Sequence, residues 1–147
     1  MRKILIDTGP LVSALDAGDS AHEVAGPLLA GLRRQAVVPT PVLAEVDHFL
    51  HRRVGGARAR AFLAEVVRGV HEVAYLSPGL VRRAVELDNR YADLALGFTD
   101  TCVMAIAERR EMPILTFDFG DFRATESSSR PWHLALDENA YRKALDR

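Results

Sequence analysis

The sequence predicts an α/β fold, a single domain with a central, mostly parallel sheet and helices on both faces. Two observations predict it. Short apolar, β-branched stretches recur along the chain, and the longer segments between them show helical periodicity, which is the alternation that βαβ units produce. No stretch among the 147 residues resembles a linker, a repeat or a low-complexity tract, so residues 1–147 are expected to form one domain.

Five segments are expected to form strands: residues 3–6, 36–39, 71–76, 113–117 and 132–136. The first, KILI, ends directly in Asp7 and is followed by Thr8, Gly9 and Pro10. A short apolar run bounded by turn residues is typical of a buried parallel strand. Asp7 is therefore expected at the carboxyl end of a strand, where a helix begins and where open α/β sheets bind ligands.

Helices are expected between these strands. Hydroxyl residues followed by proline, at Thr40-Pro41 and Ser77-Pro78, mark two helix starts. Gly55-Gly56 separates the first of these helices from another amphipathic one at residues 57–67, and the second ends near residues 89–97. Its apolar stripe comprises Leu80, Val81, Ala84, Val85 and Leu87. The helix at residues 99–110 is apolar on nearly every side and is expected in the core, and a closing strand and helix are expected after residue 131.

The formal net charge of −1 argues against a protein that coats nucleic acid by bulk electrostatics. Any nucleic-acid contact must be local, and arginine forks suit phosphate. The alternative is that the arginines named next only face water. The candidate RNA contacts are Arg52, Arg53, Arg58, Arg60 and Arg123. The single cysteine, Cys102, lies in an apolar run and is expected to pack in the core.

Three aspartates are predicted to meet at one edge of the sheet. Asp118 follows one strand as Asp7 follows another, and Asp100 lies in the first turn of the predicted core helix. Each alone has an ordinary explanation as a turn former or helix cap. Together, unpaired carboxylates about 4 Å apart would repel by roughly 4 kcal/mol per pair at an effective dielectric near 20. A cation is therefore expected among them.

A fourth acid comes from the helix that follows Thr40. Glu45 borders one edge of its apolar stripe and Asp47 borders the other, so spacing alone does not choose between them. Several carboxylates without cysteine or histidine indicate Mg²⁺, with Mn²⁺ as a substitute, rather than zinc. His48 and His51 share a helix face, but exposed histidines at this spacing more often only face solvent.

The sequence resembles the PIN-domain ribonucleases, and among them the VapC toxins of bacterial toxin–antitoxin pairs. Four segments extending over nearly all of the chain up to Arg123 carry the resemblance: ILIDTGPLVSAL, PTPVLAEVDHFL, RYADLALGFTDTCVMAIAERR and PILTFDFGDFR. Gly9 departs from the pattern, because many relatives have serine there.

The resemblance implies a PIN-like domain and an acidic quartet around the metal: Asp7, Glu45, Asp100 and Asp118. It thereby favours Glu45 over Asp47. Thr8 and Thr116 match hydroxyl positions beside the acids, where they would orient carboxylates. Asp93 and Asp121 are further acids in the matched segments, and each either assists the quartet or faces solvent; Asp121 ranks behind Asp118 because it lies beyond the strand end.

The expected activity is metal-dependent hydrolysis of RNA by an activated water. The resemblance also implies a homodimer and a VapB-like antitoxin, through which alone the chain would contact DNA. An arginine of that antitoxin is expected to meet the acids, in a groove beside the helices after Pro41 and Gly56. The alternatives are an RNA-processing PIN nuclease outside a toxin–antitoxin pair and a non-catalytic RNA- or partner-binding scaffold. Because Asp7 interrupts the first apolar run, a cytoplasmic protein without a membrane segment is expected.

Overall fold

The computed structural model describes residues 1–128 and 130–147. Its central sheet has four parallel strands in the order β3-β2-β1-β4. They are β1 (Ile4–Ile6), β2 (Ala36–Pro39), β3 (Glu72–Ala74) and β4 (Ile114–Leu115). Leu5 is the centre of the register, because it pairs with Val37 on one side and Ile114 on the other. These strands confirm four of the five predicted ones, and the inner strands are apolar because helices cover both faces.

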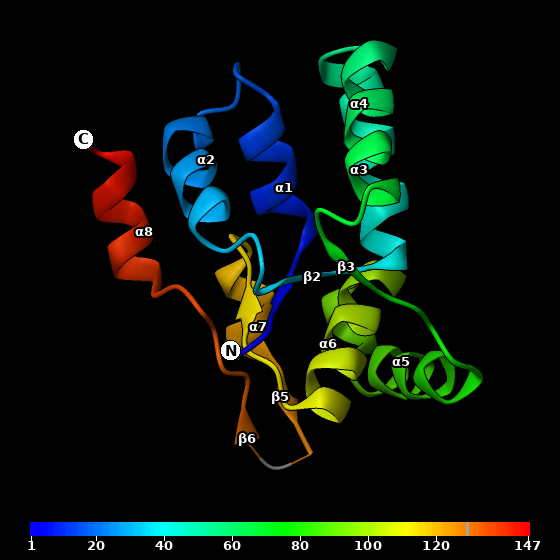
Figure 1. Cartoon of the computed structure of the whole chain (residues 1–147). Helices are drawn as coiled ribbons and strands as arrows, with labels where there is room; N and C mark the ends of the chain where they lie inside the picture. The colour runs from blue at the N-terminus through cyan, green and yellow to red at the C-terminus, as the bar shows by residue number, and fades with distance from the viewer. Residues whose placement is uncertain (129) are drawn as a thin grey trace.

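The helices form two layers, one on each side of the sheet (Figure 1). The helices of one layer connect β1 to β2 and β2 to β3, and those of the other layer connect β3 to β4. The first contains α1 (Thr8–Leu15), α2 (His22–Gly31), α3 (Thr40–Arg53) and α4 (Gly56–Val67), and the second contains α5 (Pro78–Arg90), the short 3₁₀ helix η1 (Ala92–Leu94) and α6 (Phe98–Arg110). The chain therefore moves outward from β1 and then crosses back, so the strand order reverses between β1 and β4. Crevices at the carboxyl ends of such strands are where α/β sheets bind ligands.

Helix α6 forms much of the core, as its sequence predicts. Residues 101–107 are all buried, including Cys102. Because this helix is enclosed, its first turn is held rigidly beside the carboxyl edge of the sheet. The predicted stripe of α5 is only partly right: Ala84 and Leu87 are buried, whereas Val85 is 49% exposed. No helix in the described part of the chain is long and apolar enough to cross a membrane.

The predicted start of α3 is wrong by one residue, and that of α5 is confirmed. Pro39, in extended conformation, occupies the N-cap of α3 and makes no side-chain cap bond. In contrast, Ser77 caps α5, because its Oγ accepts a hydrogen bond from the Leu80 amide at 3.2 Å. Thr40 is thus the first residue of α3 rather than its N-cap.

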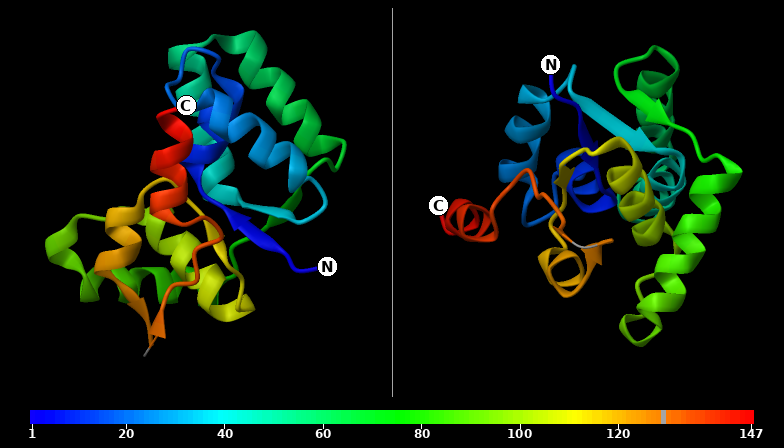
Figure 2. Two further views of the ribbon diagram at one scale, coloured as in Figure 1. Left: turned by 90° about the vertical axis from the view of Figure 1, so that its left-hand side faces the viewer. Right: turned by 90° about the horizontal axis from the view of Figure 1, so that it is seen from below.

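The predicted fifth strand at residues 132–136 is also wrong. Since β4 is only two residues long, this segment makes a single parallel bridge, Leu134 to Ile114. Trp132 instead turns inward, where its Nε1 donates to the Thr125 hydroxyl at 2.9 Å. The nearby elements are α7 (Phe119–Ala124) and a small antiparallel pair, β5 (Glu126–Ser127) with β6 (Arg130–Pro131). The predicted closing helix is confirmed as α8 (Glu138–Leu145), which lies beside α2 in Figure 1 and in the left view of Figure 2.

Candidate metal centre

Asp7 is held firmly where β1 passes into α1. Its side chain is 5% exposed and its carboxylate accepts two hydrogen bonds, from the Thr8 amide at 2.9 Å and from the Thr116 hydroxyl at 2.8 Å. Burial raises the pKa of Asp7; the two hydrogen bonds oppose this effect, and the charges of Glu45 and Asp118 add to it. The carboxylate is therefore oriented before any ligand arrives.

Thr116 links the carboxyl ends of β1 and β4. Its hydroxyl donates to Asp7 from the segment after β4 and accepts the Asp118 amide at 2.9 Å. Thr8 behaves differently: its backbone contacts Asp7, while its buried hydroxyl has no hydrogen-bond partner within the described residues. Thr8 is a lining residue of the pocket, and its buried hydroxyl is an unused donor and acceptor.

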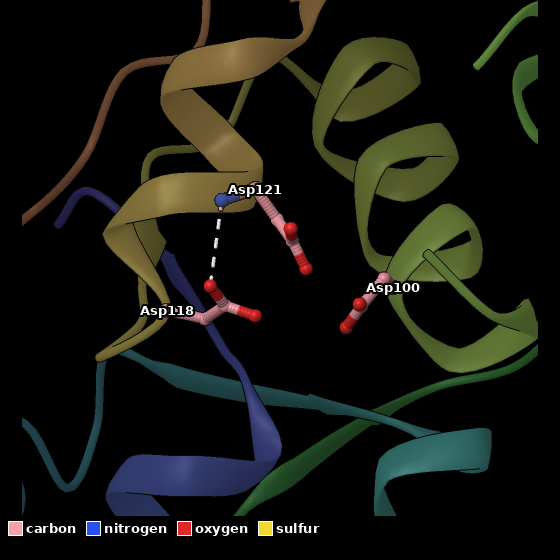
Figure 3. Close-up of side chains that lie close together, drawn as sticks. All are labelled: Asp100, Asp118 and Asp121. Carbon is pink, nitrogen blue, oxygen red and sulfur yellow. Dashed lines mark hydrogen bonds between the residues drawn. The ribbon is translucent and has the colours of Figure 1, made fainter. Parts of the chain in front are cut away.

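Three further carboxylates lie together beside Asp7. Asp100 comes from the first turn of α6, Asp118 caps α7, and Asp121 lies in the first turn of α7 (Figure 3). One oxygen from each lies within 4.8 Å of the others, and the Asp121 amide donates to Asp118 at 3.4 Å. Burial, and to a smaller extent the neighbouring acids, raise the pKa of Asp100 to about 8. At neutral pH this cluster favours a bound proton or a cation.

The remaining acids divide into those near the cluster and those apart from it. Glu45 lines the same pocket as Asp7, Asp100 and Asp118. Asp47 lies on another side of α3, 3.7 Å from His51, and Asp93 is exposed on η1. Asp121, which the sequence placed behind Asp118, lies in the same carboxylate cluster. The signal for this proximity is that Asp121 follows Asp118 by three residues, so that one is the N-cap of a helix and the other lies in its first turn. Using this signal requires that the short helix α7 be recognised in the sequence.

The acids share a pocket of about 410 Å³ with one arginine. Arg53 forms an ion pair with Asp19 at 3.4 Å, and its guanidinium lies over the Phe49 ring. The other four candidate arginines are not among the residues that line this pocket in the described structure: Arg52, Arg58, Arg60 and Arg123. Two of them are occupied elsewhere, since Arg58 donates to the Leu15 carbonyl and Arg123 pairs with Glu138 at 2.9 Å.

The chemistry of the donors fits a hard divalent cation. Carboxylate and hydroxyl oxygens face the pocket, and neither His48 nor His51 is among its lining residues. Oxygen ligands and several negative charges suit Mg²⁺ or Mn²⁺, whereas zinc prefers nitrogen and sulfur. The elevated pKa of Asp100 is what mutual repulsion and burial produce when no cation compensates them.

Comparison with known proteins identifies relatives along most of the chain. The model of the PIN domain family matches residues 4–127. Ribonuclease VapC26 of Mycobacterium tuberculosis (strain ATCC 25618 / H37Rv) is 30% identical over 122 residues, covering 82% of this chain and 90% of VapC26. The crystal structure of M. tuberculosis VapC20, described as a sarcin–ricin loop cleaving toxin, has a TM-score of 0.77 at 26% identity and covers 88% of this chain and 100% of VapC20. DNA-bound VapBC from Salmonella typhimurium, at 14% identity and a TM-score of 0.68, covers 91% of this chain and 96% of that one and shares the fold.

Proposed function

Because the chain belongs to the PIN domain family and, within it, to the VapC ribonucleases, we propose that it is a metal-dependent endoribonuclease acting as the toxin of a VapBC-type pair. One observation carries the proposal: carboxylates from the carboxyl ends of β1 and β4, from α3 and from the first turn of α6 line one pocket, and Asp121 of α7 lies close to two of them. The carboxylates of this pocket repel an anionic RNA unless a cation mediates the contact.

In this proposal the ion, Mg²⁺ or Mn²⁺, is held by the acidic quartet Asp7, Glu45, Asp100 and Asp118, with Asp121 beside it. When bound, the ion would lower the pKa of a water and neutralise charge on the phosphate. Thr116 keeps Asp7 in one orientation through their hydrogen bond.

The proposed reaction is hydrolysis without participation of the RNA 2′-hydroxyl. A water oxygen bonds to phosphorus while a carboxylate accepts the proton of the water. The P–O3′ bond breaks, and the departing 3′ oxygen acquires a proton. The products then carry a 5′-phosphate and a 3′-hydroxyl, in contrast to the 2′,3′-cyclic phosphates that a histidine pair would favour.

Substitution of the acids tests this function. Asp7→Asn and Asp100→Asn are each expected to lower RNA cleavage in Mg²⁺ or Mn²⁺ by at least about 100-fold, because electrostatic groups at reacting centres contribute about that much. Asp93→Asn is the matched control and should cleave like the wild type. Glu45→Gln should lose activity where Asp47→Asn keeps it.

The assay needs an RNA and a chemical readout. Total RNA and a sarcin–ricin loop hairpin, the RNA associated with VapC20, are suitable first substrates. Mapping both ends of the products distinguishes the two chemistries. Cleavage that survives excess chelator, or cyclic phosphate ends, would refute the metal mechanism; no cleavage of any RNA in Mn²⁺ would favour a non-catalytic scaffold.

The toxin role further proposes an antitoxin that covers the acidic pocket, and a homodimer as the toxin's own assembly. A basic antitoxin side chain, most suitably arginine, would complement the carboxylates. A pocket of about 330 Å³ with a largely apolar lining lies between α1, α2 and α4. Of the two helices expected to flank the antitoxin groove, α3 and α4, only α4 borders this pocket. Growth arrest on expression, relieved by co-expression of a co-purifying small neighbour protein, supports the toxin role. Harmless expression without such a partner contradicts it.

A further inference from the structure

Three aromatic residues line the acidic pocket in addition to its charged groups: Phe49, whose ring lies under the Arg53 guanidinium, Phe117 and Tyr141. Phe117 lies between Thr116 and Asp118 in the chain, and its ring stacks on that of Tyr141, with centroids 4.4 Å apart and planes 24° apart. Both rings are half-buried, and both line the pocket that contains Asp7. Phe119 supports Tyr141 from a second direction, at 5.5 Å between centroids. We call Phe117 and Tyr141 the aromatic wall.

The aromatic wall joins two segments that are distant in sequence. Phe117 follows β4 and so has a fixed position relative to the carboxylates, whereas Tyr141 belongs to α8, which packs against α2. The C-terminal helix thus contributes a side chain to the pocket although it lies beyond residues 4–127, the part that the PIN domain model matches. Burial, with a smaller effect of Asp19, raises the pKa of Tyr141, so its phenol adds no charge to the pocket.

The charges of the pocket oppose RNA binding. Five acids line it: Asp7, Asp19, Glu45, Asp100 and Asp118. The single arginine in the lining, Arg53, already pairs with Asp19. Side-chain charge therefore supplies little affinity for a phosphate backbone here. A bound cation would contact the phosphate, and neutral aromatic faces offer a contact to the base, because every nucleobase has a π face that stacks on them.

We propose that the aromatic wall stacks against an unpaired base next to the scissile phosphate and so positions the RNA at the carboxylates. The proposal rests on the ribonuclease function above and adds the residues that position its substrate. Bases within an A-form duplex are already stacked on their neighbours, and only unstacked bases can meet an aromatic side chain. Because Phe117 precedes Asp118 directly, the stacked base belongs to a nucleotide adjoining the phosphate at the carboxylates.

A fluorescent RNA tests the stacking directly. The probe is a 12-nucleotide single-stranded RNA with 2-aminopurine, whose fluorescence falls when it stacks, compared with the same strand in a blunt duplex. Measured with the Asp100→Asn protein to suppress cleavage, the single strand should bind more tightly than the duplex and be quenched. Tyr141→Leu, added to that protein, should weaken binding roughly 5- to 150-fold, the range that stacking of one base represents.

Matched variants separate stacking from structure. Tyr141→Phe keeps the ring and should retain affinity and quenching, and Phe117→Leu provides a second test should Tyr141→Leu not fold. Tyr75→Leu is the control, because Tyr75 is 75% exposed and is not a lining residue of the pocket. In otherwise wild-type enzyme, Tyr141→Leu should raise KM for single-stranded RNA more than it lowers kcat.

Two results would overturn the aromatic wall: unchanged quenching and affinity in folded Tyr141→Leu and Phe117→Leu proteins, or equal affinity for the duplex and the single strand. These results are distinct from failure of the ribonuclease function. That failure appears as no RNA cleavage by the wild-type chain in Mn²⁺, whereas the quenching experiment uses binding alone.

Discussion

Asp100 shows how a residue suited to a cation affects stability when the cation is missing. Its pKa is raised from 3.8 to about 8, first by burial and then by the surrounding acids. A carboxyl whose folded pKa lies above its unfolded pKa binds its proton more tightly when folded. Its contribution to stability is therefore fully present below about pH 4 and is lost as the pH rises toward about 8.

We therefore predict that Asp100→Asn stabilises the metal-free protein at pH 7. The expected increase in the free energy of unfolding is on the order of 1–3 kcal/mol, allowing for partial solvent screening. Denaturant titrations at several pH values measure it: the wild type should lose stability between pH 4 and 8 relative to the variant. Mg²⁺ should raise the melting temperature of the wild type more than that of the variant. Asp93→Asn, on the exposed η1, should change neither quantity, and an Asp100→Asn protein less stable than the wild type would contradict the prediction.

Glu108 is predicted to have the opposite pH dependence. Its carboxylate accepts two hydrogen bonds from Arg83, at 2.7 and 2.9 Å, and others from Ser127 and Ser128, so that its pKa falls to about 2. This contribution is complete above about pH 4.5 and disappears as the pH falls toward 2. Glu108→Gln should lower the free energy of unfolding by about 1–3 kcal/mol at pH 7 and by little near pH 2.5. Equal losses at both pH values would show that the ion pair is not the cause.

The acids show how much of the candidate site could be predicted from the sequence. Asp7 and Asp118 follow strands, and carboxyl ends of parallel strands meet at one edge, so their proximity follows from periodicity alone. Glu45 and Asp47 could not be distinguished in this way, because both border the same apolar stripe. Asp121 depends on the short helix α7, which has too few residues for a periodic pattern.

At the scale of helices, the two proline-marked starts differ in a way that a measurement can detect. Ser77 makes a cap bond at the start of α5, whereas the N-cap of α3 is Pro39, which makes none. We predict that Ser77→Ala lowers the free energy of unfolding by about 1 kcal/mol, with a range of about 0.5–2, because it leaves an amide at the helix start without its partner. Ser77→Asp should retain stability, and Thr40→Ala is the control. Urea denaturation of the variants measures the difference, and an equal loss in the two alanine variants would contradict it.

Elements were predictable where local pattern and tertiary environment agree. The apolar sequence of α6 required burial on every side, and the structure supplies it. The segment at residues 132–136 alternates like a strand, but its neighbour β4 is too short to pair with more than one of its residues. Val85 likewise belongs to the apolar stripe of α5, but this stripe is wider than the surface that α6 covers, so Val85 stays exposed. Both errors arise because the size of the neighbouring element, β4 or α6, limits the packing, and periodicity within one segment gives no information about that size.

At the scale of the whole molecule, the topology explains why chemistry is concentrated at one place. The strand order reverses between β1 and β4, so the helices after these two strands diverge to opposite faces and leave a crevice. Asp7 and Asp118 follow those strands, and α6 and α8 close the crevice with Asp100 and Tyr141. Residues from both ends of the chain, such as Asp7 and Tyr141, therefore meet in this pocket only when the whole domain is folded.

This dependence predicts that residues 1–147 unfold as one domain. The single tryptophan, Trp132, is buried beside Phe122 in the C-terminal part of the chain, so its fluorescence reports that part, whereas far-UV circular dichroism reports all the helices. Because the hydrophobic core is continuous from Leu5 to Trp132, and α8 packs on α2, the two signals should change at the same temperature and denaturant concentration. A tryptophan transition that precedes the loss of helical signal would mean that the C-terminal segment is a separate unit, and that Tyr141 can leave the acidic pocket while the rest of the domain stays folded.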